Sequence, residues 1–168
     1  MGIERLQRRL QAARGEIPAD LVLSGGRLAN VYTGDWQETD VALFYGIIVG
    51  LGDYPGPRLP LSGRYLLPGL IDGHLHLESS MLTPPELARA VLPRGTTAVV
   101  CDPHEIANVW GGAGLDYLLN ASAGLPVDFF FMLPSCVPAS PLETSGARRR
   151  PTIRSSTGIT PGFWDWGR

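Results

Sequence analysis

The sequence predicts an α/β protein in which a small antiparallel β unit precedes a parallel sheet or barrel. Two patterns support this prediction. Between residues 21 and 51, short apolar runs alternate with glycine-containing turns, as in antiparallel sheets. From residue 65 onward, apolar strands alternate with helical segments, which is the order typical of parallel sheets. With 168 residues, of which 44% are hydrophobic and 18% charged, the chain is long enough to bury a core and unlike a disordered protein.

Residues 1–64 are predicted to form an N-terminal helix followed by strands. Residues 3–14 have helical spacing, with Ile3, Leu6 and Leu10 on one face. A Ser-Gly-Gly turn after residue 23 is expected to separate the first strand from the second. The predicted strands are residues 21–23, 28–32, 41–45 and 47–51. Short strands joined by glycine turns predict an antiparallel unit.

After residues 55–64, a connection rich in proline and glycine, the pattern changes. Thr83 is a plausible N-cap of a helix that begins at Pro84 and ends before Gly95. The predicted elements are strands at 65–71, 96–102 and 127–136, and helices at 83–94 and 114–126. This alternation predicts a parallel sheet or barrel.

Polar residues follow the ends of these strands. His74, Asp102 with His104, and Ser135 with Cys136 lie at or just past the ends of the three predicted strands. Because (β/α) barrels build their active sites where strands end and loops begin, we expect these clusters on one rim.

Two of the three histidines, His74 and His76, are separated by one leucine. In an extended strand both imidazoles point to the same side, where they could hold one divalent ion and activate a water molecule. Asp72 and Glu78 supply carboxylates nearby. The alternative is an exposed loop with incidental histidines, but the apolar strand before them favours a metal site.

The other polar residues near this strand each have two interpretations. His104 and Glu105 could contact the metal or substrate, or lie in the first turn of a helix capped by Asp102, and both could hold at once. Glu78 and Ser79 either bind substrate or cap the helix at Pro84. The two cysteines lack a C-x-x-C partner and are expected to be buried apolar residues.

Composition excludes several classes of function. A formal net charge of −2 gives no indication of nucleic-acid or anionic-membrane binding. The N-terminus lacks the apolar region of a signal peptide, and no run of about 18 apolar residues predicts a membrane span. Two cysteines suit a reducing compartment. We therefore expect a cytoplasmic protein.

Longer motifs resemble a known family. The segment LLPGLIDGHLHLESSM, followed by DPHEIANV and LPSCVPA, closely resembles the adenine deaminases of the amidohydrolase superfamily. Residues 20–53 resemble the first part of the small β-sandwich that accompanies the barrel in that family. The resemblance extends over residues 15–147.

The resemblance implies a (β/α)8 TIM-like barrel and the metal-dependent hydrolysis of adenine to hypoxanthine and ammonia (EC 3.5.4.2), a step of purine salvage. His74 and His76 match the metal ligands of the first barrel strand. Glu78, Ser79, Asp102, His104 and Glu105 are expected to bind substrate or support the ligands. The implied metal is Mn²⁺ or Fe²⁺, with Zn²⁺ as an alternative. The implied partner is the small molecule adenine, and the full-length relatives are expected to be homo-oligomers.

The sequence departs from the family after the third predicted strand. No histidine follows His104, so the later metal ligands and the proton-shuttling carboxylate are missing, and we expect a truncated barrel. Residues 148–168 look aberrant. If the possible codons of residues 159–168 are read in a frame shifted by one nucleotide, they can encode a peptide that resembles the family strand carrying the metal-bridging glutamate. A frameshift or sequencing error would explain this tail.

Three domains are therefore predicted: residues 1–64 form the helix and partial β-sandwich, residues 65–147 form the first βα units of the barrel, and residues 148–168 form the aberrant tail. The chain alone is expected to be inactive, because two histidines do not complete a hydrolytic metal site. The alternatives are another cyclic amidohydrolase, or a non-catalytic fragment that binds metal or a partner.

Overall fold

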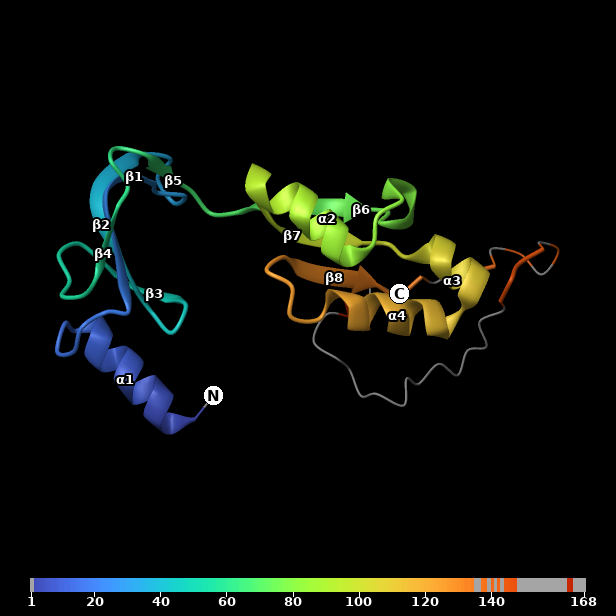
Figure 1. Cartoon of the computed structure of the whole chain (residues 1–168), viewed down its shortest axis with the longest axis horizontal. Helices are drawn as coiled ribbons and strands as arrows, with labels where there is room; N and C mark the ends of the chain where they lie inside the picture. Colours follow the sequence, from blue (N-terminus) through green and yellow to red (C-terminus); the bar gives the residue numbers. More distant parts are fainter. Residues whose placement is uncertain are drawn as a thin grey trace. The chain divides into compact units, whose positions relative to one another are not determined.

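The computed structural model describes residues 2–134, 137–138, 140, 142, 144–147 and 163–164. The chain divides into two compact units, Met1–Pro68 and Gly69–Arg168 (Figure 1). Both contain strands and helices, so the predicted α/β class is confirmed. Among the described residues, no helix has the length and hydropathy needed to cross a membrane.

The first unit is one five-stranded sheet with a helix, α1 (Ile3–Ala13). The strand order is β3-β2-β1-β4, and β5 also pairs with β1. The pairings of β1 with β2 and of β2 with β3 are antiparallel, as predicted. The strands are β1 (Leu21–Ala29), β2 (Trp36–Phe44), β3 (Ile47–Leu51), β4 (Arg58–Pro60) and β5 (Tyr65–Leu66). The parallel pairing of β4 and β5 with β1 was not predicted, and β4 lies inside the expected connection.

The two predicted strands at 21–23 and 28–32 are one continuous strand, β1, so the predicted turn between them is wrong. The pairing with β2 shifts register between Leu23 and Gly26, and Gly25 has a φ of 67°. These features describe a β-bulge, in which a glycine with positive φ inserts an extra residue without ending the strand. The glycines therefore bend β1 instead of reversing it.

The second unit is a parallel sheet in the order β6-β7-β8-β9. Its strands are β6 (Leu70–Leu75), β7 (Thr96–Cys101), β8 (Asp128–Met132) and β9 (Phe163–Trp164). Its α-helices are α2 (Pro84–Val91), α3 (His104–Trp110) and α4 (Gly112–Ser122), and 3-10 turns occupy Glu78–Ser80 and Leu92–Arg94. Helices connect β6 to β7 and β7 to β8, which is the predicted βαβ order.

One apolar cluster holds the second unit together. It joins buried side chains of α2, α4, β7 and β8, the elements that lie side by side in Figure 1. Phe131 and Val99 are each 1% exposed, and Leu118 of α4 is equally buried. The helices therefore cover one face of the sheet and fix the relative positions of the strand ends.

The predicted strand at 65–71 is divided between the two units. Its first residues pair with β1, whereas Leu70 begins β6 after Pro68 and Gly69. Pro68 has no backbone N–H to donate to a neighbouring strand. A Cβ at Gly69 would overlap the Thr97 side chain, so this glycine allows the start of β6 to lie against β7. The break places the histidine-bearing strand wholly in the second unit.

β6 lies at an edge of its sheet, with Leu70 and Ile71 exposed by 61% and 69%. Exposed apolar edge strands promote association between chains. We expect this chain to self-associate, and we expect Ile71→Lys to shift sedimentation-velocity profiles toward monomer. Gln37→Lys adds the same charge to an exposed position of the other unit and is the matched control. Equal profiles for both variants would contradict this prediction.

Candidate metal centre

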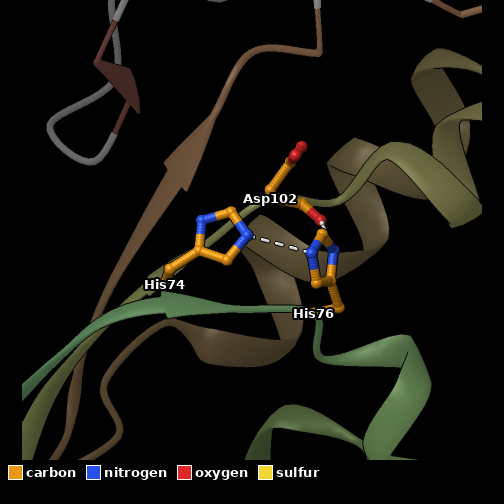
Figure 2. A group of neighbouring side chains, drawn as sticks. All are labelled: His74, His76 and Asp102. Carbon is orange, nitrogen blue, oxygen red and sulfur yellow. Dashed lines mark hydrogen bonds between the residues drawn. The ribbon is translucent and has the colours of Figure 1, made fainter.

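The predicted histidine pair lies at the carboxyl end of β6, beside the end of β7. His74 is on β6, His76 follows the strand directly, and Asp102 follows β7. The Nε2 atoms of the two histidines are 3.0 Å apart, so both imidazoles face one point, as the period of two predicts (Figure 2). Atoms of Asp102 and of both imidazoles lie within 4.8 Å of one another. Parallel strands bring these groups together because their carboxyl ends meet at one edge.

The partners of His76 indicate which ring nitrogen carries its proton. Nδ1 of His76 is 3.1 Å from the backbone carbonyl oxygen of Asp102. Because a carbonyl oxygen only accepts hydrogen bonds, Nδ1 is assigned the N–H and donates it. The lone pair is then on Nε2, the atom that faces His74. This tautomer leaves Nε2 available as a metal ligand.

This donor set fits a divalent cation. Two imidazole nitrogens 3.0 Å apart are close enough to bind one ion at the usual metal–nitrogen distance of about 2.0–2.1 Å. Asp102 adds a carboxylate, and its side chain is 25% exposed. His74 is exposed, so solvent or further ligands can approach from that side. Two imidazoles and one carboxylate match the nitrogen and oxygen ligands that zinc, manganese and iron accept.

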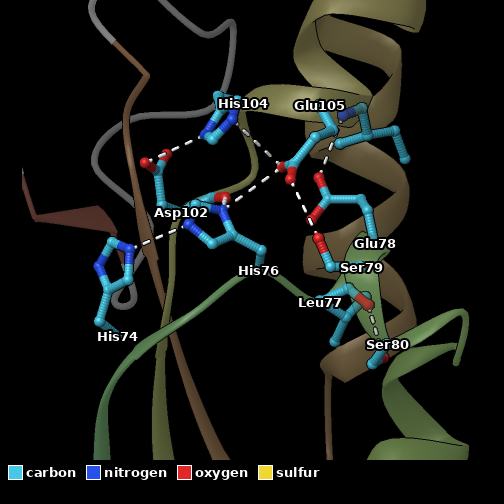
Figure 3. Close-up of polar contacts among 10 residues, drawn as sticks. His74, His76, Leu77, Glu78, Ser79, Ser80, Asp102, His104 and Glu105 are labelled. Carbon is cyan, nitrogen blue, oxygen red and sulfur yellow. Dashed lines mark hydrogen bonds and ion pairs between the residues drawn. The ribbon is translucent and has the colours of Figure 1, made fainter.

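A second group of potential ligands adjoins the first. Glu105 Oε2 is 3.5 Å from Nδ1 of His76 and 3.7 Å from Nε2 of His104. Nδ1 of His104 is 3.2 Å from Oδ2 of Asp102. His104 therefore lies between two carboxylates, and His76 belongs to both groups (Figure 3).

The structure tests one of the two interpretations of Glu78 and Ser79, the capping of α2. Oε1 of Glu78 accepts a hydrogen bond from the backbone N–H of Ile106, 3.1 Å away, in the first turn of α3. Ser79 Oγ donates to Oε1 of Glu105 at 3.3 Å. Neither residue caps α2, so that interpretation is wrong: Thr83 occupies the N-cap position without a side-chain hydrogen bond.

Capping of α3 by Asp102 is also wrong. The N-cap residue of α3 is Pro103, which makes no side-chain capping hydrogen bond. Asp102 instead pairs with His104, because its carboxylate is turned toward that imidazole. The cap is supplied by Glu78, which is distant in the sequence, so local spacing could not reveal it. Ser79, Glu105, His104 and Asp102 thus form one connected group, and Glu78 binds the backbone N–H of the residue that follows Glu105.

We expect Glu78→Ala to destabilise the second unit by about 1–2 kcal/mol, because the Ile106 N–H loses its acceptor at the start of α3. Glu78→Gln keeps an amide oxygen at that position and should lose less. Urea unfolding followed by circular dichroism measures both. Equal stability of Glu78→Ala and the unsubstituted chain would contradict the assigned cap.

Two further residues of this region, Cys101 and Asn108, are not assigned as metal ligands. Cys101 is fully buried at the end of β7, and this burial, reinforced by the charges of Glu78 and Asp72, raises the pKa of its thiol to about 12. It is therefore a buried neutral residue, as expected. Oδ1 of Asn108 is buried without a hydrogen-bond partner, and sequence reasoning did not single it out. The predicted rim residues Ser135 and Cys136 lie outside the described residues.

Comparison with known proteins adds an independent finding. Residues 65–162 match the model of the amidohydrolase family. Adenine deaminase of Kosmotoga olearia is 50% identical over 141 residues, which cover 83% of this chain and 24% of that protein. Adenine deaminase of Syntrophobacter fumaroxidans is 51% identical over 147 residues, covering 87% of this chain and 26% of that protein. The chain thus spans about a quarter of the length of these relatives.

Two further matches, one to a protein sequence and one to a solved structure, cover different shares of this chain. Adenine deaminase of Geobacillus kaustophilus is 46% identical over 161 residues, covering 95% of this chain and 27% of that protein. A solved structure of N-acyl-D-glutamate deacylase from Bordetella bronchiseptica, complexed with zinc and a phosphonate inhibitor, is 25% identical with a TM-score of 0.44. The matched region covers 51% of this chain and 19% of the deacylase chain.

Proposed function

Because this chain belongs to the amidohydrolase family, we propose that it supplies the first metal ligands of an enzyme that hydrolyses adenine to hypoxanthine and ammonia. The observation that carries the proposal is the convergence of His74 Nε2 and His76 Nε2, 3.0 Å apart, at the end of β6. The relatives named adenine deaminase, about 50% identical over most of this chain, indicate the substrate. The residues of this chain that would hold the ion are His74 and His76, with Asp102 beside them.

A divalent ion bound there would polarise water for attack on the carbon that carries the amino group of adenine. The chain's own residues hold the ligands in place. The Asp102 carbonyl oxygen accepts the His76 Nδ1–H and so keeps the Nε2 lone pair directed toward His74. Asp102 and His104 form an ion pair when the imidazole is protonated, which orients the Asp102 carboxylate at the same edge. No carboxylate among the residues that the structure describes is assigned the proton transfer to the leaving amine.

Several parts of the proposal rest on the family resemblance. The metal is Mn²⁺ or Fe²⁺, with Zn²⁺ as the alternative, since imidazole and carboxylate ligands suit all three. The partner is adenine, and neither nucleic acid nor membrane is required. The cytoplasmic location and the homo-oligomeric state of the longer relatives stay predictions.

Another cyclic amidohydrolase is the main alternative, since the histidine pair alone does not identify a substrate. A non-catalytic metal-binding or interaction fragment is the second. These alternatives differ in their expected turnover: the first predicts hydrolysis of ring amides, and the second predicts metal binding without any hydrolysis.

A chimaeric enzyme tests the proposal. The segment of the Kosmotoga olearia adenine deaminase that aligns with this chain is replaced by the corresponding segment of this chain. We expect release of ammonia from adenine, and none from hydantoin or dihydrouracil. The unsubstituted Kosmotoga protein is the control. A folded, metal-loaded chimaera that hydrolyses a ring amide in preference to adenine would overturn the substrate assignment.

The aberrant tail, residues 148–168, is proposed to arise from a frameshift or sequencing error. The family match, however, extends to residue 162, beyond the end of the resemblance at residue 147. Resequencing the DNA from the codon of Gly146 onward decides the question. A single-base change that restores a frame similar to the relatives would support the frameshift, and an unchanged frame would contradict it.

A further inference from the structure

Glu105 lies in the first turn of α3, where an acidic residue is often explained by the helix dipole alone. The contacts of Glu105 indicate a different role. Oε2 of Glu105 is buried and forms no hydrogen bond, although it faces Nδ1 of His76 at 3.5 Å and Nε2 of His104 at 3.7 Å. The N–H of Ile106 in the first turn of α3 is instead bound by Glu78. The carboxylate of Glu105 is therefore directed at two imidazoles and not at the helix backbone.

The orientation of this carboxylate is fixed from its other side. Ser79 Oγ donates to Oε1 of Glu105 at 3.3 Å, and Ser79 itself belongs to the turn that follows the histidines (Figure 3). The Glu105 side chain is 37% exposed and that of His76 is 30% exposed, so solvent only partly screens their interaction. Segments after β6 and after β7 are thus connected through one carboxylate.

We propose that Glu105 is a positioning residue for the metal ligand His76. Its negative charge beside Nδ1 favours the tautomer in which Nδ1 carries the proton and Nε2 carries the lone pair. The Asp102 carbonyl oxygen, at 3.1 Å, is the nearer acceptor, and Glu105 adds the charge that a carbonyl lacks. Carboxylates next to metal-bound histidines raise the basicity of the ligand and fix its ring orientation. This inference rests on the proposed metal site.

The test uses Glu105→Gln, which removes the charge and keeps the shape of the side chain. Glu86→Gln, an exposed glutamate of α2 paired with Arg89, is the matched control. The first measurement is the ring tautomer of His76 in the metal-free chain, from two-bond ¹H–¹⁵N correlations. We expect the Nδ1–H form to predominate in the unsubstituted chain and in the control, and the Nε2–H form to increase in Glu105→Gln.

The second measurement is the affinity for Mn²⁺ by isothermal titration calorimetry. We expect Glu105→Gln to weaken binding by about 10–100-fold, while the thermal unfolding of the metal-free chain stays unchanged. Glu105→Asp should recover part of the affinity because it restores the charge. A structural role alone would instead lower the unfolding temperature of Glu105→Gln without changing the tautomer.

Three results would overturn the inference. An unchanged tautomer in Glu105→Gln would show that Glu105 does not position His76, even if no metal binds. Equal Mn²⁺ affinity of Glu105→Gln and Glu86→Gln would show the same in the metal-bound state. Two bound equivalents, of which Glu105→Gln loses one, would make Glu105 a ligand of a second ion. Absence of Mn²⁺ binding by the unsubstituted chain contradicts the proposed metal site instead, and the tautomer measurement still decides the role of Glu105.

Discussion

Replacing His76 with alanine should lower the affinity of the chain for Mn²⁺ by more than about 100-fold, since loss of a ligand costs more than the 10–100-fold typical of its outer partners. The reason is that His76 Nε2 is one of two imidazole nitrogens at the proposed site, 3.0 Å from the other. His74→Ala should have a similar effect. Isothermal titration calorimetry with Mn²⁺ measures both variants.

His104→Ala is the matched control for these variants. It removes an imidazole of the same region, with a side chain that is 46% exposed and directed at Asp102 and Glu105. We expect it to weaken binding far less than His76→Ala. If His104→Ala abolished binding while His74→Ala had no effect, the ion would lie in the second group of ligands and the assignment would be wrong.

Phe131→Ala should destabilise the second unit by about 3–5 kcal/mol, the usual cost of emptying a buried phenylalanine site. Phe131 is 1% exposed on β8 and belongs to the cluster that joins α2 and α4 to the sheet. The free energy of unfolding of a small domain is about 5–15 kcal/mol, so this loss is a large part of it. The variant should therefore unfold at a markedly lower urea concentration.

Tyr117→Ala is the control for Phe131→Ala, because Tyr117 is an aromatic residue of the same unit that is 39% exposed on α4. Circular dichroism during urea unfolding measures both. Comparable losses for the two variants would mean that the cluster around Phe131 is not the main core of this unit.

Several elements of the second unit were predictable because their signals are local, whereas β9 lies in the segment predicted to be an aberrant tail. Pro84 begins α2, as predicted, but α2 ends at Val91; Gly95, with a φ of 93°, follows the 3-10 turn Leu92–Arg94. The β-branched run at Thr96–Cys101 is a strand, as predicted. The spacing of two between His74 and His76 was enough to predict that their rings share one side.

Features that depend on distant residues were not predictable from the sequence. The glycine pair in β1 could have formed a turn or a bulge, and pairing with β2 across the sheet decides between them. The cap of α3 by Glu78 joins residues far apart in the chain, and it displaced the local candidate Asp102. The helical spacing of apolar residues in α1 was predictable, but such spacing does not show that the face is buried: Ile3 is 77% exposed.

The most direct test of the metal site is anomalous diffraction from crystals of this chain grown with Zn²⁺, recorded at the zinc absorption edge. The proposed site predicts one anomalous peak between Nε2 of His74 and Nε2 of His76, at about 2.0–2.1 Å from each nitrogen. A peak beside Nδ1 of His76 and the carboxylate of Glu105, with none between the two Nε2 atoms, would contradict it.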